Sequence, residues 1–355
     1  MVKSVLRLIL SGLFLFLTAI LTLVGRFAPE LIRKVYMPLS RAAMTFLSGI
    51  FSVLPVAVWE LLVVALLIWL LCSLVRNFSD LKITQWFTGL LLGVSVTVFL
   101  FMALWGLNYY APSIQVQLGL SERECSVEEL KQATVYYRNM ANLTANSVTR
   151  EDSGAMAPVS FEQLAHKAAD GYMILEIRTE SFRGSKSAPK RLISGNLFAF
   201  GGSQGIFVPF TGESCVSGST YSAVLPFAMC SQMGKRMGFA RRDEAEFAAF
   251  LACASGESAQ FVYSGYFIAF SYCYNALYAR DRAVAESVWQ GVGAELKADC
   301  LGRIEYESGR ENQATKDKWE TLGEQYQKFL QEKLGTKTAD SVTNLLTIWY
   351  LEGAI

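Results

Sequence analysis

Residues 225–247 read LPFAMCSQMGKRMGFARRDEAEF. The first half predicts a helix over 225–238 that ends at Gly238, because glycine is the usual residue where a helix closes. The second half predicts another helix over 243–253. The polar residues of these two predicted helices are the ones by which the fold and the chemistry of the chain can be compared with those of known protein families.

Three more patterns flank the pair, namely P-F-T-G-E at 209–213, D-E-A-x-F at 243–247 and Y-S-G at 263–265. With S-Q-M-G-K at 231–235 they resemble an uncharacterised family of bacterial membrane proteins, in which three helices precede a gluzincin-like domain. Gluzincins are zinc metallopeptidases with H-E-x-x-H on a helix, and the family pattern there reads H-E-x-A-H. The resemblance covers about 205–278 and, more loosely, the front of the chain. It implies a mostly α membrane protein with a small β edge in its helical domain.

The positions that would carry zinc chemistry hold other residues. A two-histidine site needs neutral imidazoles four residues apart on one helix face, with a carboxylate as general base. Here Ser231 and Lys235 stand at the imidazole positions, and Gln232 stands at the base position. An amide cannot take a proton from water at neutral pH. The chain has one histidine, His166, so we expect no zinc, no other cofactor and a degenerate motif.

The resemblance also places Glu244 at the position of the third metal ligand. A buried carboxylate without a nearby cation is costly. One hypothesis is that the Lys235 ammonium replaces zinc as the partner of Glu244. The alternative is that Lys235 points into solvent.

The run Gly205–Phe210 predicts a short strand, and Pro209 places it at a sheet edge. Peptidases of this type hold an extended substrate along such an edge, and edge pairing is a general way to bind peptides. The candidate groove consists of Gly205, Phe207, Phe210, Glu213 and Tyr263. If Met233, Met237 and Phe210 fill it, we expect no peptide binding.

Two other nucleophile patterns occur. Ser231 and Lys235 are within reach for a serine–lysine dyad, which would also need an oxyanion hole and a lysine of lowered pKa. Residues 201–205 fit G-x-S-x-G, but a nucleophile elbow lies between a strand and a helix. A strand-like run follows this segment instead, so we predict a glycine loop. His166 is interpreted as a solvent-facing or partly packed side chain.

Composition indicates a membrane protein. Of 355 residues 52% are hydrophobic, and the net charge of +1 leaves no nucleic-acid footprint. Apolar runs predict transmembrane helices at about 5–25, 54–75 and 84–107. A signal peptide is the alternative for the first run, but further spans follow it and no small-residue cleavage site does. This gives a membrane region at 1–110 and a metallopeptidase-like domain at 111–355.

The first loop, 26–53, is interpreted as an amphipathic segment at the membrane surface. Glu60 is interpreted as an interfacial carboxylate rather than a buried functional acid. The aromatic run 105–110 is interpreted as an interfacial belt that closes the third span.

The sequence gives little on membrane orientation. Four basic residues on each side leave the positive-inside count tied. The resemblance favours an inside N-terminus and an extracytoplasmic C-terminal domain in a multi-pass cell-membrane protein. Seven cysteines with no C-x-x-C exclude a zinc ribbon or redox motif and suit a reducing compartment.

Further helices are expected at about 126–147, 160–177, 263–277, 280–296, 319–334 and 341–351. The leading interpretation is an inactive metallopeptidase-like membrane protein, a pseudoenzyme, that binds peptide or protein partners in the former substrate groove. The alternatives are a hydrolase with altered chemistry at Ser231 and Lys235, or a purely structural membrane component whose groove has closed.

Overall fold

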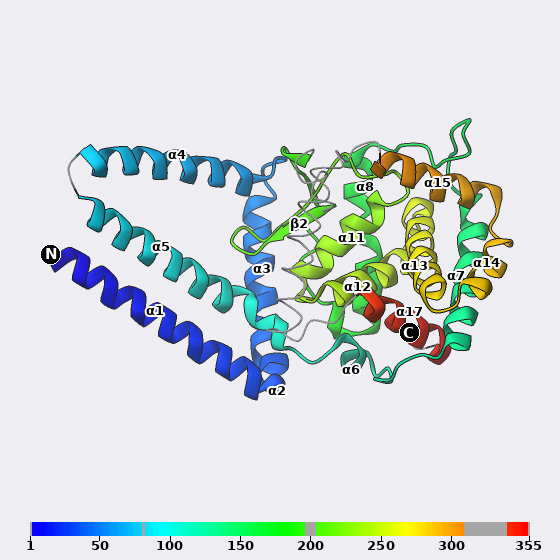
Figure 1. Ribbon diagram of the computed structural model, residues 1–355, viewed down its shortest axis with the longest axis horizontal. Coiled ribbons are helices and arrows are strands. Elements are labelled where there is room, and N and C mark those ends of the chain that lie inside the picture. Colours follow the sequence, from blue (N-terminus) through cyan, green and yellow to red (C-terminus); the bar gives the residue numbers. More distant parts are fainter. Residues whose placement is uncertain (1, 80–81, 196–203, 309–338, 354–355) are drawn as a thin grey trace.

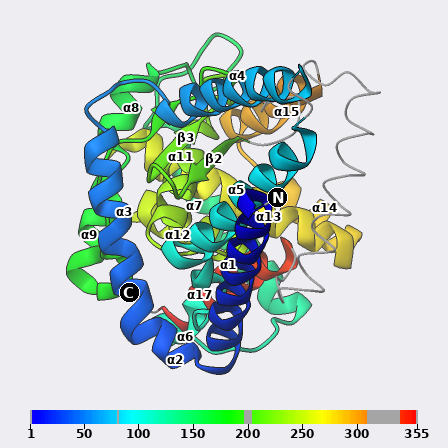
Figure 2. The same cartoon turned by 90° about the vertical axis from the view of Figure 1, so that its left-hand side faces the viewer.

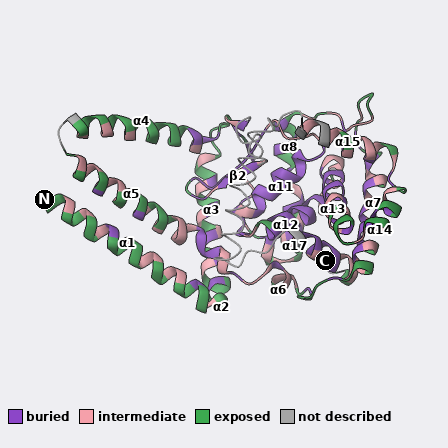
Figure 3. Ribbon diagram, in the orientation of Figure 1, coloured by how far each residue is buried: buried purple, intermediate pink, exposed green. Residues whose placement is uncertain are grey.

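The computed structural model describes residues 2–79, 82–195, 204–308 and 339–353. Three long apolar helices, α1 (Val2–Phe27), α4 (Val58–Ser79) and α5 (Ile83–Leu104), project from one side of a compact domain (Figure 1). Their residues are largely exposed (Figure 3), and most of the exposed apolar ones are leucine, valine and isoleucine. Each helix is long enough to cross a bilayer. The chain is therefore a multi-pass membrane protein with the predicted spans, and α4 begins at Val58 rather than near 54.

The spans satisfy their own polar groups. The hydroxyls of Ser11, Thr88 and Ser95 each donate to the carbonyl four residues earlier, at 2.8, 3.0 and 2.8 Å. Such bonding is required in a bilayer, where water is absent. Helices α1 and α5 lie side by side, whereas α4 diverges from them (Figures 1 and 2).

A helix crosses the domain-side ends of the spans. After α1 the chain turns through α2 (Pro29–Leu31) and a π-helical turn η1 (Ile32–Tyr36) into α3 (Met37–Phe51), which connects to α4. The face of α3 toward the domain buries Met37, Ser40, Met44 and Ser48, at helical spacing. Leu39, Phe46 and Ile50 remain exposed on α3. The first loop is therefore an amphipathic helix.

The sheet has three short strands, β1 (Lys190–Arg191), β2 (Gly205–Val208) and β3 (Glu213–Val216), in the order β1-β3-β2. Strand β3 pairs parallel with β1 and antiparallel with β2, with Phe207 opposite Ser214. Among the strands of the described residues β2 lies at an edge, as Pro209 predicted. One sheet face packs on α11 (Leu225–Arg236), and the other packs on the α3–α4 connection through Ala57 and Trp59.

The domain core is helical. Helices α7 (Val127–Ala145), α12 (Arg242–Ser255), α13 (Ala259–Arg280) and α17 (Ala339–Glu352) surround it together with α11. Helix α7 begins with the predicted capping box, in which Ser126 and Glu129 satisfy each other's backbone N–H. The remaining elements are η2 (Gly106–Tyr110), α6 (Ile114–Leu118), α8 (Phe161–Lys167), α9 (Asp170–Arg178), η3 (Glu180–Phe182), α14 (Arg282–Trp289) and α15 (Ala294–Ser308).

Two segments that were each predicted as one continuous helix form two helices. The helix expected over 160–177 is split into α8 and α9, and the one expected over 280–296 is split into α14 and the start of α15. After the first break, Gly171 in the first turn of α9 lies so close to α12 that a methyl group on it would come within 1.8 Å of the Ala252 carbonyl oxygen. The helix predicted over 319–334 lies outside the described residues.

The end of the third span is part of the domain core. Trp105 is 5% exposed and packs with Met44, Phe207 and Ala240. The prediction that it belongs to an interfacial belt was therefore wrong. Nearby, Arg41 of α3 donates through Nε to the carbonyl of Met237, at 2.7 Å. Spans, α3 and domain thus share buried contacts.

Candidate functional site

Helix α11 is fixed at both ends by groups that the sequence patterns contain. At its start, the Ser264 hydroxyl accepts from the N–H of Phe227 at 3.1 Å and donates to the carbonyl of Ala223 at 2.6 Å. At its end, Gly238 adopts φ +97°, and the N–H of Phe239 bonds the carbonyl of Gly234 at 3.2 Å. The predicted glycine closure is confirmed, and Y-S-G is a helix cap in this structure.

Gln232, which the resemblance places at the position of a general base, is packed against the sheet. Gln232 is 5% exposed, and a methyl group on Gly205 of β2 would come within 3.1 Å of its Cγ. Its carbonyl accepts from the Ser214 hydroxyl at 2.9 Å. Its side-chain oxygen has no hydrogen-bond partner among the described residues. The side chain therefore fills the space between α11 and β2.

Lys235 lies where α11 meets the third span. Its carbonyl accepts a 2.8 Å hydrogen bond from the indole N–H of Trp105. Burial lowers the pKa of its ammonium, while the negative charge of Glu246 acts in the opposite direction. Within the described part of the chain Lys235 makes no ion pair, and no hydrogen bond joins it to Ser231. The geometry of a serine–lysine dyad is therefore not present.

Glu244 does not pair with Lys235, so that hypothesis was wrong. One carboxylate oxygen accepts from Arg241 at 2.5 Å and from the N–H of Ile114, at the start of α6, at 2.9 Å. Burial raises the pKa of Glu244, and the Arg241 charge opposes that rise. The carboxylate whose charge acts on Lys235 is Glu246, which bonds Arg242 at 2.8 Å.

The candidate groove between β2 and α11 is filled by the chain itself. Met233 and Met237 are fully buried, and Phe207 is 8% exposed. The rings of Phe207 and Trp105 lie 5.2 Å apart, with Met44 of α3 in the same cluster. Phe210 is 39% exposed at the β2–β3 turn and takes no part in this filling.

Glu213 and Glu60 join the sheet to the start of α4. The two carboxylate oxygens of Glu213 accept from the N–H groups of Val58 and Trp59, both at 2.9 Å, and one of them bonds Lys190 at 2.7 Å. Glu60 accepts from the N–H groups of residues 193 and 194 at 2.7 and 2.9 Å and is 8% exposed. Glu60 is therefore a buried carboxylate that joins the first turn of α4 to the loop after β1. Unpaired N–H groups at a helix start favour such carboxylates.

Tyr263 belongs to a buried network that sequence reasoning missed. Its hydroxyl donates to Asp299, which is fully buried and also binds Arg150. The Tyr221 hydroxyl donates to the same carboxylate at 2.9 Å. The Arg150 guanidinium lies 4.7 Å from the centre of the Tyr263 ring. Burial raises the pKa of Tyr263, which keeps its phenol protonated. The network therefore joins α13 and α15 to the segment after α7 through an ion pair and phenol hydrogen bonds.

The residues at 231, 232 and 235 do not fit zinc. They offer a hydroxyl, an amide and an ammonium, whereas thiolate, imidazole and carboxylate are the groups that bind this ion. Among the described residues no group of three His, Cys, Asp or Glu side chains is placed to hold a metal. The described cysteines are free thiols. Of the G-x-S-x-G pattern, residues 201–203 lie outside the described ranges.

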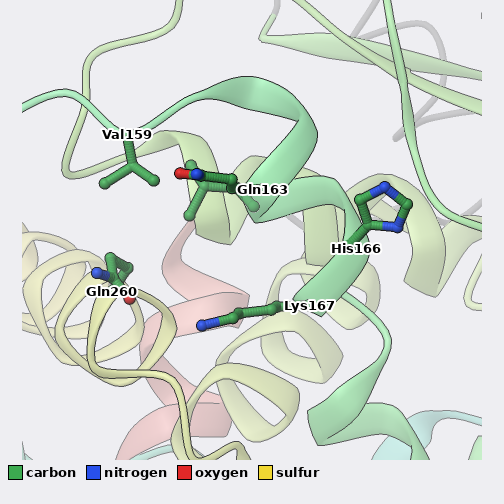
Figure 4. Close-up of a pocket in the computed structure, with 6 residues that line it drawn as sticks. Val159, Gln163, His166, Lys167 and Gln260 are labelled. Atoms are coloured by element: carbon green, nitrogen blue, oxygen red, sulfur yellow. The ribbon is translucent and has the colours of Figure 1, made fainter.

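A shallow pocket of about 480 Å³ lies elsewhere, between α8 and the start of α13, lined by Val159, Gln163, Leu164, His166, Lys167 and Gln260. Figure 4 shows Gln163, Lys167 and Gln260 around the space, with His166 on the same helix as Gln163 and Lys167. His166 is exposed, as predicted. The pocket does not coincide with the α11–β2 groove.

A search of curated proteins and a search of solved structures found no match to this chain. A scan against protein-family models did find a match. A family model described as "Protein of unknown function (DUF3810)" matches residues 34–347, which is most of the chain from the amphipathic helix to α17. The chain belongs to this uncharacterised family.

Proposed function

We propose that this chain is a catalytically inactive, gluzincin-like membrane protein that acts as a scaffold. The resemblance at 209–213, 231–235, 238–247 and 263–265 supports the peptidase-like ancestry. The loss of both imidazoles and of the base supports the inactivity, because hydrolysis of this type needs an activated water.

A single observation carries the scaffold role. The third span inserts Trp105 between β2 and α11, where its indole binds the carbonyl of Lys235 and its ring packs on Phe207. On the other side of the same groove Gln232 lies against Gly205. A substrate strand would have to displace buried side chains that the membrane spans hold in place. The structural interpretation is therefore preferred over peptide binding inside the groove.

A second candidate function is recognition of an extended peptide by the outer edge of β2. Its place at the end of the strand order favours this, because edge strands pair with added strands. Such a peptide would pair with main-chain groups and leave the filled groove undisturbed. Addition of a β-strand by this route needs neither Ser231 nor Lys235.

The proposal is tested by zinc content of the purified full-length chain in detergent, measured by elemental analysis. The comparison is the triple variant Ser231→His, Gln232→Glu and Lys235→His. We expect wild type without zinc and the variant with about one zinc per chain, since both imidazoles would return to one helix face. Stoichiometric zinc in wild type, or a folded triple variant that takes up none, would overturn the gluzincin-like assignment.

The third ligand is identified by two matched changes in the triple variant. Glu246→Gln should lower zinc uptake, because the Glu246 charge acts on position 235 and its carboxylate can exchange Arg242 and Tyr272 for the metal. Glu244→Gln should leave zinc bound, because Glu244 is held by Arg241 and Ile114. The reverse result would place Glu244 at the ligand position that the family resemblance implies.

A further inference from the structure

The face of the domain from which the membrane spans project carries exposed apolar side chains. Phe210 lies in the β2–β3 turn, where Gly212, at φ +65°, packs so closely on α3 that an added methyl group would meet the Ser48 nitrogen at 2.7 Å. Figures 1 and 2 show this hairpin beside α3 and facing the gap between α4 and α5. The turn is therefore fixed on the side from which the spans project.

The same side includes the loop after β1. Ile193 is 62% exposed, and its N–H donates to Glu60 in the first turn of α4, so it stands at the level where the second span begins. On α3, Phe46 is 68% exposed, and Val53 beyond its end is 81% exposed. We call this set the domain underside, and it consists of Leu39, Phe46, Ile50, Val53, Ile193 and Phe210.

We propose that the domain underside is inserted in the bilayer interface, so that the β2–β3 turn and the loop after β1 contact lipid directly. Its continuity with the spans carries this inference. The amide of Ile193 is bonded to a residue of α4, and α3 connects α1 to α4, so the surface cannot lie far from the membrane that the spans cross. Contiguous exposed apolar surface of this kind marks a membrane or protein contact.

The arrangement of the spans selects lipid over a second protein. Helix α4 diverges from α5, and the hairpin faces the space between them (Figures 1 and 2). Acyl chains fill an irregular gap between diverging helices without a complementary partner surface. On the neighbouring turn η1, the exposed Arg33 and Lys34 both pair with Glu30, so this cluster of two cations and one carboxylate keeps an excess of positive charge that suits anionic headgroups.

Nitroxide accessibility tests the proposal on the full chain in phosphatidylcholine–phosphatidylglycerol vesicles. The background carries Cys72→Ser and Cys300→Ser, and the other cysteines are buried. Single labels are introduced by Phe210→Cys, Ile193→Cys and Phe46→Cys. The matched control is Leu143→Cys, because Leu143 is 65% exposed on α7, on the side of the domain away from the spans (Figure 1).

We expect the first three labels to collide more with oxygen than with a water-soluble nickel complex, and the control to show the opposite. Oxygen concentrates in lipid, whereas the nickel complex stays in water. Nickel accessibility at positions 193 and 210 equal to that at 143 would overturn the proposal. Exclusion of both reagents would also overturn it, since it would show that protein, such as a second copy, covers the surface.

Discussion

Glu213 is expected to hold the second span to the sheet, and Glu213→Gln tests this. The wild-type carboxylate is 3% exposed, binds two N–H groups at the start of α4 and pairs with Lys190, which is 8% exposed. The amide keeps the size of the side chain but leaves the Lys190 ammonium with only carbonyl partners. Removing one partner of a buried pair costs about 3–5 kcal/mol.

The magnitude converts into a measurable shift in melting temperature. We take about 3 kcal/mol, because the amide oxygen still accepts one of the two hydrogen bonds. At about 2–4 °C per kcal/mol, the apparent Tm should fall by roughly 6–12 °C. The assay is intrinsic tryptophan fluorescence during heating in a fixed detergent. Glu128→Gln is the control, since Glu128 is 64% exposed and its pair with Lys131 is a surface pair.

A double variant separates the ion pair from the loss of a helix cap. Lys190→Met removes the uncompensated charge, so Glu213→Gln with Lys190→Met should regain at least half of the lost Tm. If the double variant melts no higher than Glu213→Gln, or if the single variant melts within about a degree of wild type, the buried pair does not have the role assigned to it.

Three further changes have defined outcomes. Gly171→Ala places a methyl group 1.8 Å from the Ala252 carbonyl oxygen and should lower the free energy of unfolding in urea by about 1–3 kcal/mol or more. The control Gly49→Ala, where an added methyl group meets nothing within 4 Å, should leave that free energy unchanged. Trp105→Phe loses one hydrogen bond and should cost about 1 kcal/mol, so an unchanged midpoint would contradict it. Lys235→Met should stabilise the chain at pH 7, because burial lowers the pKa of that ammonium. Wild-type stability should then rise with pH toward the unfolded value of about 10.4, and the gain should shrink there; a constant gain between pH 7 and 10 would contradict this.

Local signals in the sequence predicted local structure well. Length and hydropathy identified three spans, Ser126 and Glu129 predicted the start of α7, and Gly238 predicted the end of α11. Each of these depends on residues within a few positions of one another. Pro209 likewise indicated an edge strand, because a proline has no N–H for a further partner.

Partners that are distant in sequence were not predictable in this way. The carboxylate of Glu244 binds the N–H of Ile114, 130 residues away, and nothing near Glu244 announces that contact. Trp105 lies in an aromatic run that is typical of an interfacial belt, but Phe207 and Met44 bury it. The break between α8 and α9 falls at Ala168 and Ala169, which are good helix formers, so no residue in the break announces it.

The attachment of α4 to the sheet has a consequence for how the protein is made. Val58 and Glu213 are 155 residues apart, so the carboxylate that caps the second span is synthesised long after that span. At about 5–20 residues per second, the ribosome needs roughly 8–30 s to reach it. During this interval the N–H groups of Val58 and Trp59, at the start of α4, are without their final partner. Insertion of the second span therefore precedes its attachment to the sheet, and translation of residues 190–213 supplies the groups that hold the start of α4.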